Sequence, residues 1–356
     1  MPKLGLQQIA RLVNGQVING RKGLTFSDYH FDSRKMEKNS LFFALKTDTN
    51  DGHRYVKDLM AYESVAAVVS KDFSKEGIHI PLIVVEDPFT AVLALAEAVR
   101  NLYPSIKYVG ITGSAGKTTT KEFLYQILSS KMKVYRSHLN WNNWIGLPFS
   151  ILKMDGDEAV AVFELGMSDP GIGEIDLLAS ILKPDIAMIL NILPVHLEFL
   201  KTIENIAQAK SEILNYLGSD SIAFVQGDFD SAVRLAKKKI GRIEYFGKTK
   251  GINRFLLGNI TRKNDISEFN LEYFGIRICF KTKLISHSQI ENLFAAMLAA
   301  KHLGMKDQEI QRAIWNLKPL ARRGSISKVR NRTIIDESYN SNPEALKKTL
   351  SWIDIE

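Results

Sequence analysis

Apolar positions in the first third of the chain fall into short blocks whose spacing predicts strands and one long helix. Three blocks bounded by Gly, Pro and Asp are typical of buried strands, at residues 41–45, 66–69 and 82–85. Residues 91–102 repeat apolar side chains at the spacing of a helix face, and Tyr103, Pro104 and Ser105 then end the helix. The pattern predicts a small N-terminal α/β domain over residues 1–103.

The middle of the chain alternates apolar strands with helices. Strands are predicted at 108–112, 159–165 and 186–192, and helices at 117–130, 175–182 and 203–217. This alternation favours a doubly wound, mostly parallel sheet with helices on both faces. Two further helical patterns, 288–303 and 307–317, complete a central domain over residues 104–318.

A third region follows residues 318–324, which contain Pro319 and two arginines and are predicted to be a linker. A strand at 333–336 comes next, and a helix is predicted to open at Pro343. One strand and one helix are too little to bury a core. We therefore expect residues 319–356 to be the beginning of a C-terminal α/β domain that is incomplete in this chain.

Charge and composition narrow the class of protein. The 356 residues are 45% hydrophobic and 24% charged, which favours a folded chain of two or three domains. A net charge of +8 would suit nucleic acid, an acidic membrane surface or a phosphorylated small molecule. The densest basic run, residues 237–239, has no interleaved aromatic side chains and is predicted to be a solvated helix end. Nucleic acid is therefore not expected as a partner.

Neither a secretory leader nor a membrane span is expected. Residues 1–15 form an amphipathic pattern, and Lys183, Pro184 and Asp185 interrupt the most apolar later region well short of the ~20 residues that a span needs. A cytoplasmic protein is the expectation. The only cysteine, Cys279, lies in an alternating apolar stretch, where we expect a buried strand residue rather than a nucleophile or metal ligand.

The strongest chemical signal is a glycine-rich segment, Gly110-Ile-Thr-Gly-Ser-Ala-Gly-Lys-Thr-Thr-Thr120, between a predicted strand and a predicted helix. Phosphates need accessible backbone N–H groups, a helix N-terminus, a lysine charge and a hydroxyl beside Mg²⁺. The segment is shorter than the full P-loop pattern, because Ile111 stands where that pattern has glycine, and a plain turn is the alternative. The residues expected at the phosphates of ATP are Gly113, Ser114, Ala115, Gly116, Lys117, Thr118 and Thr119.

Polar side chains at the ends of later strands add candidates for a metal site. Glu164 ends an apolar strand, and the carboxyl edge of a parallel sheet is where such folds bind ligands. Next to a phosphate loop, a Mg²⁺ ligand is a stronger interpretation of Glu164 than an ordinary strand end. His196 follows the next predicted strand and is a second candidate. Lys210, within a predicted helix, reads by itself as a surface lysine.

Taken together, these segments resemble the Mur ligase superfamily of peptidoglycan synthesis. The phosphate loop, the Glu164 strand end, Leu193-Pro-Val-His196 and Gln208-Ala-Lys-Ser-Glu212 all contribute to the resemblance. Further support comes from Asp32-Ser-Arg34 with Leu41-Phe-Phe-Ala-Leu-Lys46 and Asp51-Gly-His53, from Asn140-Trp-Asn-Asn-Trp-Ile-Gly-Leu-Pro148, and from Asp336-Glu-Ser-Tyr-Asn-Ser-Asn-Pro343. Each fragment is weak alone, but the set spans nearly the whole chain in order.

The resemblance implies a three-domain, ATP- and Mg²⁺-dependent ligase, and within the family the branch that joins D-alanyl-D-alanine to UDP-N-acetylmuramoyl-tripeptide. It implies a monomer that activates the substrate carboxylate as an acyl phosphate. Glu164, His196, Thr118 and Lys210 would hold Mg²⁺, with Lys210 carrying a carbamate. Ser33, Arg34, Asn140, Asn142 and Asn143 would contact the nucleotide-linked substrate, Asn292 the adenine, Arg323 the phosphates, and either Asp336 or Glu337 the ATP.

Three other functions remain open at this point. Another Mur-type ligase, or a folate polyglutamylating relative, would use the same phosphate chemistry on a different acceptor. A nucleotide-binding module without ligase activity is a second possibility, given the short C-terminal region. A nucleic-acid ATPase is a remote third, because the basic residues lack a clustered aromatic and arginine surface.

Overall fold

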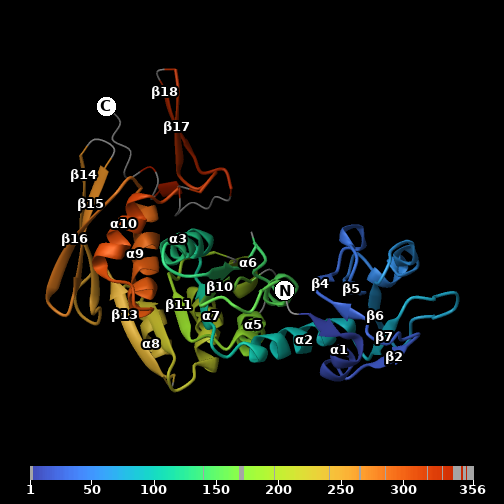
Figure 1. The fold of residues 1–356 in the computed structure, drawn as a ribbon. Coiled ribbons are helices and arrows are strands. Elements are labelled where there is room, and N and C mark those ends of the chain that lie inside the picture. Colours follow the sequence, from blue (N-terminus) through green and yellow to red (C-terminus); the bar gives the residue numbers. More distant parts are fainter. Residues whose placement is uncertain are drawn as a thin grey trace. The chain divides into compact units, whose positions relative to one another are not determined.

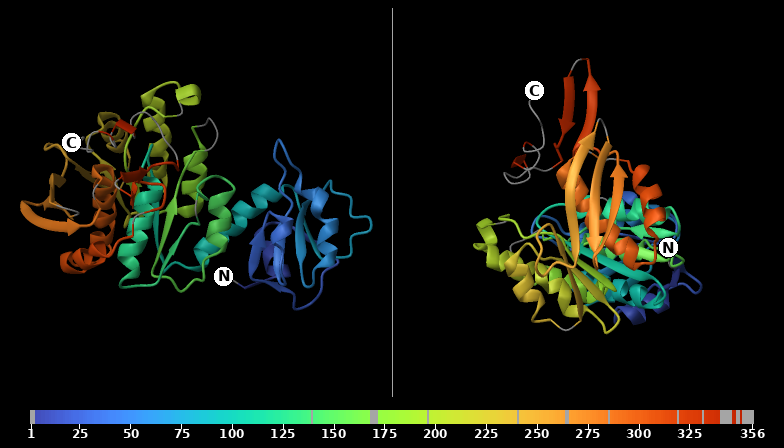
Figure 2. Two further views of the ribbon diagram at one scale, coloured as in Figure 1. Left: turned by 90° about the horizontal axis from the view of Figure 1, so that it is seen from above. Right: turned by 90° about the vertical axis from the view of Figure 1, so that its left-hand side faces the viewer.

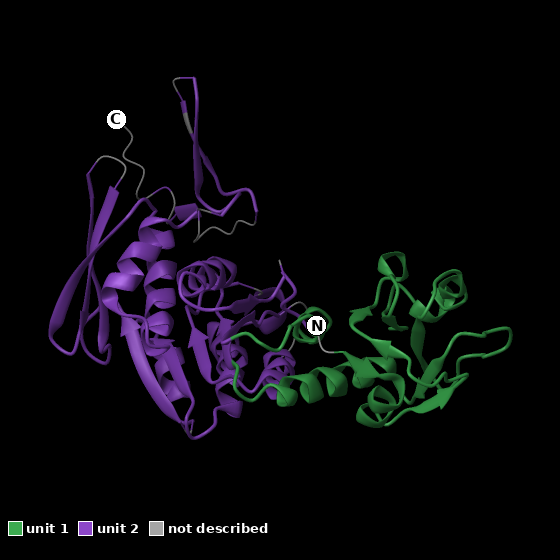
Figure 3. Ribbon diagram, in the orientation of Figure 1, with its two compact units in different colours: residues 1–106, 144–158 green, residues 107–143, 159–356 purple. Residues whose placement is uncertain are grey.

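The structure is a computed structural model that describes residues 3–138, 140–167, 172–195, 197–239, 241–263, 266–284, 286–318, 320–330, 332–339, 346–347 and 350. The chain divides into two compact units (Figure 3). Unit 1 comprises Met1–Ile106 and Trp144–Glu158, and unit 2 comprises Lys107–Asn143 and Ala159–Glu356. The last segment, 319–356, groups with unit 2 rather than forming a unit of its own. No helix of the described residues combines the length and apolar character needed to cross a membrane.

Unit 1 is built on a five-stranded sheet in the order β2-β7-β6-β5-β4. Strands β4 to β7 run parallel and β2 pairs antiparallel with β7, while β1 and β3 form a separate pair. The three strands predicted here are confirmed as β5, β6 and β7. The elements of unit 1 up to residue 102 are β1 (Leu4–Gly5), α1 (Leu6–Leu12), β2 (Gln16–Ile18), β3 (Thr25–Phe26), β4 (Asp28–His30), η1 (Ser33–Lys35), β5 (Ser40–Phe43), η2 (Gly52–Tyr55), η3 (Lys57–Ala61), β6 (Ala66–Ser70), β7 (Leu82–Val85) and α2 (Pro88–Leu102).

One segment from the middle of the sequence returns to complete unit 1. Helix α4 (Gly146–Leu152) is buried along its whole length. Its Phe149 ring lies 4.9 Å from the Phe31 ring and 5.7 Å from the Phe43 ring, measured between centroids. Aromatic pairs at this separation stabilise a core beyond the area they bury. Residues 144–158 are therefore part of the N-terminal core, although they lie beyond the first strand and helix of unit 2 in the sequence.

Unit 2 contains a nine-stranded sheet in the order β16-β15-β14-β13-β12-β11-β8-β10-β9 (Figure 1). Strands β8 to β14 pair with one another in parallel, which confirms the predicted doubly wound sheet. Its elements are β8 (Lys107–Thr112), α3 (Lys117–Ser129), β9 (Val134–Arg136), β10 (Val160–Glu164), α5 (Glu174–Leu182), β11 (Ile186–Ile189), α6 (Leu197–Leu200), α7 (Ile203–Ser211), η4 (Glu212–Tyr216), β12 (Ile222–Gln226), α8 (Asp230–Ala236), β13 (Arg242–Gly247), β14 (Phe255–Lys263), β15 (Ile266–Tyr273), β16 (Ile276–Thr282), α9 (His287–His302) and α10 (Asp307–Trp315).

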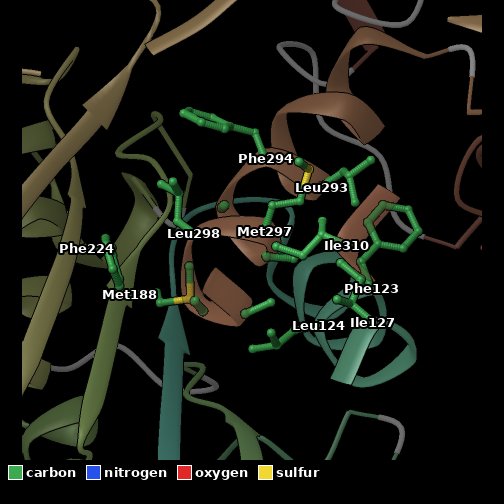
Figure 4. Close-up of a cluster of buried hydrophobic side chains, with 14 of the residues drawn as sticks. Phe123, Leu124, Ile127, Met188, Phe224, Leu293, Phe294, Met297, Leu298 and Ile310 are labelled. Atoms are coloured by element: carbon green, nitrogen blue, oxygen red, sulfur yellow. The ribbon is translucent and has the colours of Figure 1, made fainter. Parts of the chain in front are cut away.

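Helices cover both faces of this sheet. Alternate residues of the central strands, such as Ile111 of β8 and Met188 of β11, share one buried cluster with α3, α9 and α10 (Figure 4). The other face lies against α5 and η4, since a side chain at Gly110 would lie 3.2 Å from both Leu182 and Ile213. Side chains alternate faces along a strand, so the continuous apolar strands are explained by burial on both sides. Lys237 and Lys238 are exposed just after α8, as predicted for this basic run.

Three antiparallel strands, β14 to β16, extend the sheet beside α10, as Figure 2 shows in orange. The prediction that Cys279 is buried is wrong: it lies on β16 but is exposed. Residues 278, 280 and 282 alternate with it, and Phe280 and Thr282 are the buried ones. Cys279 therefore occupies the opposite, exposed side of this edge strand.

The C-terminal part that the structure describes is an antiparallel hairpin of β17 (Ser325–Val329) and β18 (Arg332–Asp336). The sequence pattern predicted β18 but not β17. Two residues of β17 are serines and one is lysine, so the apolar signal for a strand was weak there. The predicted helix opening at Pro343 lies outside the described residues.

Candidate active site

The phosphate loop lies between β8, in the middle of the parallel strands, and the N-terminus of α3. Gly116 caps the helix with φ = +82°, and Gly113 has φ = +155°. A side chain at Gly116 would also collide with the amide of Asn292 on α9. Glycine is therefore required at Gly116 both by the left-handed backbone and by the close approach of Asn292.

Asn191, in the segment that follows the neighbouring strand β11, holds the loop through hydrogen bonds. The Asn191 side chain accepts a hydrogen bond from the Ala115 N–H (2.8 Å) and donates one to the Ala115 carbonyl (3.0 Å). Its own carbonyl accepts from the Ser114 N–H at 3.1 Å. The Ser114 hydroxyl donates in turn to the Leu193 carbonyl at 3.1 Å. The conformation of the loop is therefore held by the Asn191 side chain and by the carbonyls of Asn191 and Leu193, which lie 76 to 79 residues away in sequence.

Sequence reasoning missed Asn191. The predicted strand 186–192 included it, whereas β11 ends at Ile189. A polar amide inside the otherwise apolar run Leu190-Asn191-Ile192 was the available signal, because an unpaired amide is costly in a buried strand.

Replacing Asn191 with leucine is expected to weaken binding of a non-hydrolysable ATP analogue by about tenfold, because Ala115 of the loop loses both hydrogen bonds to the Asn191 side chain. The variant should also lose roughly 1–3 kcal/mol of stability, since two backbone groups are left without partners. Calorimetric titration and chemical denaturation measure the two effects. Asn316→Leu, which removes an amide bonded to the Arg312 carbonyl at 3.0 Å, is the matched control. An affinity within twofold of the wild type for Asn191→Leu would refute this role of Asn191.

Lys117 is the first residue of α3, and its ammonium lies over the loop. Its Nζ donates to the Gly113 carbonyl at 2.8 Å. Burial lowers the pKa of Lys117, and the nearby charge of Arg323 lowers it further, whereas the carboxylate of Glu164 acts in the opposite direction. The lysine charge, the loop amides and the Glu164 carboxylate thus meet at the carboxyl edge of the sheet.

Glu164 ends β10 beside the loop and is only 3% exposed. Its Oε2 accepts from the Thr118 hydroxyl at 2.8 Å, and its Oε1 accepts from the Asn142 side-chain amide at 2.8 Å. Three candidates that are far apart in sequence therefore touch. Thr119, the next residue of α3, is buried, so it is Thr118 whose hydroxyl faces the carboxylate.

The interpretation of Lys210 as a surface lysine is wrong, because its residue is only 3% exposed within α7. Burial holds the pKa of Lys210 well below its ordinary value, and the charge of Lys117 lowers it further. Within the described chain, no carboxylate stabilises its charged form. Burial therefore disfavours the charged form of Lys210 relative to that of a lysine in water.

A pocket beside the loop opens between α9 and the ends of β12 and β13. Asn292 lies where this pocket meets the loop at Gly116. An ion pair between Lys248 and Glu291 lies on its wall. The pocket is lined by Leu190, Asn191, Gln226, Phe246, Gly247, Lys248, Leu257, Glu291, Asn292, Phe294 and Ala295.

Arg323 precedes the hairpin β17–β18. Its positive charge acts on Lys117 of the loop and lowers the pKa of that lysine. Its guanidinium lies 3.8 Å from the centroid of the Tyr339 ring. The side chain of Ser338 lowers the pKa of Asp336, and the Ser338 N–H, which donates to the aspartate at 3.0 Å, lowers it further. The Glu337 carboxylate instead lies next to Gly324, where an added side chain would come within 3.2 Å of it.

The remaining candidates are divided between the units. In unit 1, Arg34 is exposed on η1 and makes two hydrogen bonds, each 2.9 Å, to the Asp32 carboxylate, with Ser33 half-buried beside it. In unit 2, Asn140 is exposed and Asn143 half-buried on either side of Asn142. His196 lies outside the described residues, so the structure does not place it.

Comparison with known proteins agrees with this arrangement. Residues 111–300 match the family model described as the Mur ligase middle domain. The chain is 31% identical to the UDP-N-acetylmuramoyl-tripeptide–D-alanyl-D-alanine ligase of Bacillus subtilis, over 98% of this chain and 75% of that protein. It is 32% identical to the enzyme of the same name from Rickettsia prowazekii, over 92% of this chain and 72% of that protein.

Solved structures give the same result. A crystal structure of MurF from Acinetobacter baumannii superposes with a TM-score of 0.89 and 26% identity, covering 98% of this chain and 76% of that one. MurF ligase from Thermotoga maritima, solved in complex with ADP, superposes with a TM-score of 0.82 and 27% identity. That match covers 93% of this chain and 75% of the Thermotoga chain.

Proposed function

Since the chain belongs to the Mur ligase family, we propose that it joins D-alanyl-D-alanine to UDP-N-acetylmuramoyl-tripeptide with hydrolysis of ATP to ADP and phosphate. The observation that carries this function is the likeness to ligases of that name over 92% to 98% of the chain. The phosphate loop next to Glu164 and Lys210 provides the chemistry. We place the reaction in the cytoplasm and propose that the protein works as a monomer.

The reaction requires activation of a carboxylate. A terminal carboxylate oxygen of the tripeptide attacks the γ-phosphorus of ATP, the bond to the β-phosphate oxygen breaks, and an acyl phosphate and ADP result. The dipeptide amine then adds to the acyl carbon, and the tetrahedral intermediate expels phosphate as the amine loses its proton. Both steps build up negative charge, so fixed positive groups and N–H donors accelerate them.

The residues of unit 2 supply these groups. The amides of the loop and the ammonium of Lys117 would bind the β- and γ-phosphates. Arg323, whose charge already acts at Lys117, would bind the γ-phosphate. Gly324 is flanked by the Glu337 carboxylate and donates its N–H to the Asp336 backbone carbonyl at 2.9 Å, so both acidic residues stay candidates for contact with ATP. Asn292, which lies against Gly116 of the loop, would contact the adenine.

The oxygen-rich set at the sheet edge fits Mg²⁺. A buried carboxylate and a hydroxyl that already contact each other are hard oxygen ligands, which this ion prefers. Glu164 and Thr118 would hold the ion, with His196 as a further candidate. When bound, Mg²⁺ neutralises charge on the transferring phosphoryl group. Asn142 would keep the Glu164 carboxylate oriented through its 2.8 Å hydrogen bond.

Lys210 fits a carbamate. The neutral amine is the form that attacks CO₂: a C–N bond forms, one proton leaves, and an anionic carbamate replaces a cation. The burial that lowers the pKa of Lys210 favours this neutral form. The product would add two oxygen ligands to the site, and its negative charge would be balanced by Lys117 and by a bound cation.

Two groups of residues are proposed to contact the nucleotide-linked substrate. In unit 1, Ser33 and the exposed Arg34 would contact its uridine diphosphate. In unit 2, Asn140, Asn142 and Asn143 would contact its peptide-bearing part, because Asn142 already lies at Glu164.

A panel of substrates tests the proposed function. UDP-N-acetylmuramoyl-tripeptide, the shorter UDP-linked precursors and folate are each paired with D-alanyl-D-alanine, single amino acids or glutamate. ADP and ligated product are both measured. We expect product only with the tripeptide and D-alanyl-D-alanine, with one ADP released per bond formed. Product with another pair would identify a different ligase, and nucleotide binding without ADP or product would identify a binding module.

A further inference from the structure

Three glutamines of unit 2 hydrogen-bond to the backbone of segments distant in sequence. Gln126 of α3 accepts from the Lys318 N–H at 2.9 Å and donates to the Lys318 carbonyl at 3.3 Å. Gln289 of α9 donates to the carbonyls of Arg323 (2.9 Å) and Gly324 (3.3 Å). Gln311 of α10 makes two 2.9 Å bonds with the backbone of Lys281 on the edge strand β16. Two of the three thus hold opposite ends of one segment, 318–324.

The two helices that hold this segment are the helices of the phosphate site. Helix α3 begins at Lys117, and α9 carries Asn292 against Gly116 three residues after Gln289. Both helices belong to the same buried cluster, which Figure 4 shows. A segment fixed to them is therefore fixed with respect to the phosphate loop.

The contact at Gln289 is buried and closely fitted. Gln289 is 4% exposed, and both carbonyls it binds belong to a turn in which Gly324 has φ = +75°. A side chain at Gly324 would lie 2.9 Å from the Gln289 amide nitrogen. Glycine at 324 allows the backbone to reach the amide, and the amide satisfies carbonyls that would otherwise lose their hydration.

Arg323 lies at this anchored turn. Its carbonyl is bound by Gln289, while its guanidinium lies 3.8 Å from the Tyr339 ring centroid. The Tyr339 N–H donates to the Arg322 carbonyl at 3.1 Å, so the ring is tied to the same turn. Gln289 therefore holds the backbone of Arg323, and Tyr339 contacts its side chain.

We propose that Gln289, supported by Gln126, is a positioning residue that anchors the backbone at Arg323 so that the guanidinium stays aligned with the phosphates of the bound nucleotide. The inference rests on the proposed role of Arg323. Gln289 itself is not proposed to contact the substrate. Aligned cations act on phosphoryl groups only within narrow limits of geometry, which gives a reason for anchoring the turn in a buried contact.

A double-mutant cycle between Gln289 and Arg323 tests the proposal. The probe is a non-hydrolysable ATP analogue with Mg²⁺, titrated calorimetrically into the full chain. Gln289→Leu keeps the side-chain volume and removes the donor. We expect it to weaken binding about tenfold in the wild-type background but less than twofold in an Arg323→Ala background, because neighbours that act through one another are not additive. A purely structural role would weaken binding equally in both backgrounds.

Gln311→Leu is the matched control, because it removes a similar glutamine–backbone pair at the edge of the sheet. It should lower the denaturation midpoint yet leave the affinity for the analogue unchanged. Gln126→Leu tests the other end of the segment at a more exposed position. It should weaken binding about threefold, again only when Arg323 is present, and it provides the cycle if Gln289→Leu does not fold.

The outcomes separate this inference from the proposed function. Equal losses with and without Arg323, or no loss in either glutamine variant, overturn the positioning role even if the wild type ligates. A wild type that binds the analogue but makes no ligated product overturns the proposed function, while the cycle still decides the role of Gln289.

Discussion

Lys117→Ala is expected to reduce ATP-dependent phosphate release by on the order of 10³-fold, because it removes an ammonium that lies at the loop proposed to bind the phosphates. Its Nζ lies 2.8 Å from the Gly113 carbonyl, inside the loop itself. The side chain is half-buried, so its charge acts more strongly on developing negative charge than it would in water. Phosphate release in the presence of both other substrates measures the effect.

Lys131→Ala provides the control for this substitution. Lys131 follows α3 and pairs with Glu309 at 2.9 Å on the surface, so the variant loses one lysine from the same part of the chain. Turnover within twofold of the wild type is expected, since exposed ion pairs contribute little. If Lys117→Ala also kept turnover near that of the wild type, the phosphate role of the loop would be lost, and with it the ligase mechanism.

Glu164→Gln is expected to raise the Mg²⁺ concentration for half-maximal activity and to lower the maximal rate by on the order of 10²-fold. The amide keeps the shape of the side chain and can still accept from one neighbour. However, its NH2 group replaces one of the two oxygens that accept from Thr118 and Asn142, and it removes the charge that attracts the metal. Phosphate release over a Mg²⁺ titration separates the two effects.

A second buried carboxylate shows whether any such loss is generic. Glu158 of unit 1 accepts from the N–H groups of Asp155 (2.9 Å) and Gly156 (2.8 Å), and it is 6% exposed. Glu158→Gln should lower stability but leave the Mg²⁺ dependence unchanged. An unchanged Mg²⁺ titration for Glu164→Gln would exclude Glu164 as a metal ligand.

Local sequence predicted several of the strands and helices of unit 2 and the loop proposed to carry its chemistry. The strand predicted at 108–112 is β8 (Lys107–Thr112), and the helix predicted at 117–130 is α3 (Lys117–Ser129). These succeed because the information is local: apolar periodicity sets the type of element, and a phosphate loop consists mostly of its own glycines and backbone amides. The position of Glu164 beside the loop also followed, since parallel neighbours end at one edge.

Residues whose role depends on distant partners were misjudged or missed. Asn191 brackets Ala115 across 76 residues of sequence, and the strand pattern gave no indication of that contact. Gln289 holds a turn 34 residues away. The packing of α4 in the core of unit 1 could not be predicted either, because the spacing of apolar residues in a helix does not show which sheet that helix packs against.

The sequence by itself determined the alternation of strands and helices, the phosphate loop and the family. Only the tertiary structure decided that Lys210 is buried where the charge of Lys117 acts on it, and that Cys279 is exposed on an edge strand. It also showed that Asn191 and Gln289 hydrogen-bond to backbone turns at the site. The physical reason is that burial and long-range hydrogen bonds depend on which segments meet in space. A helical period places Lys210 on a helix face, but only the packing of that helix decides whether its amine meets water or the charge of another lysine.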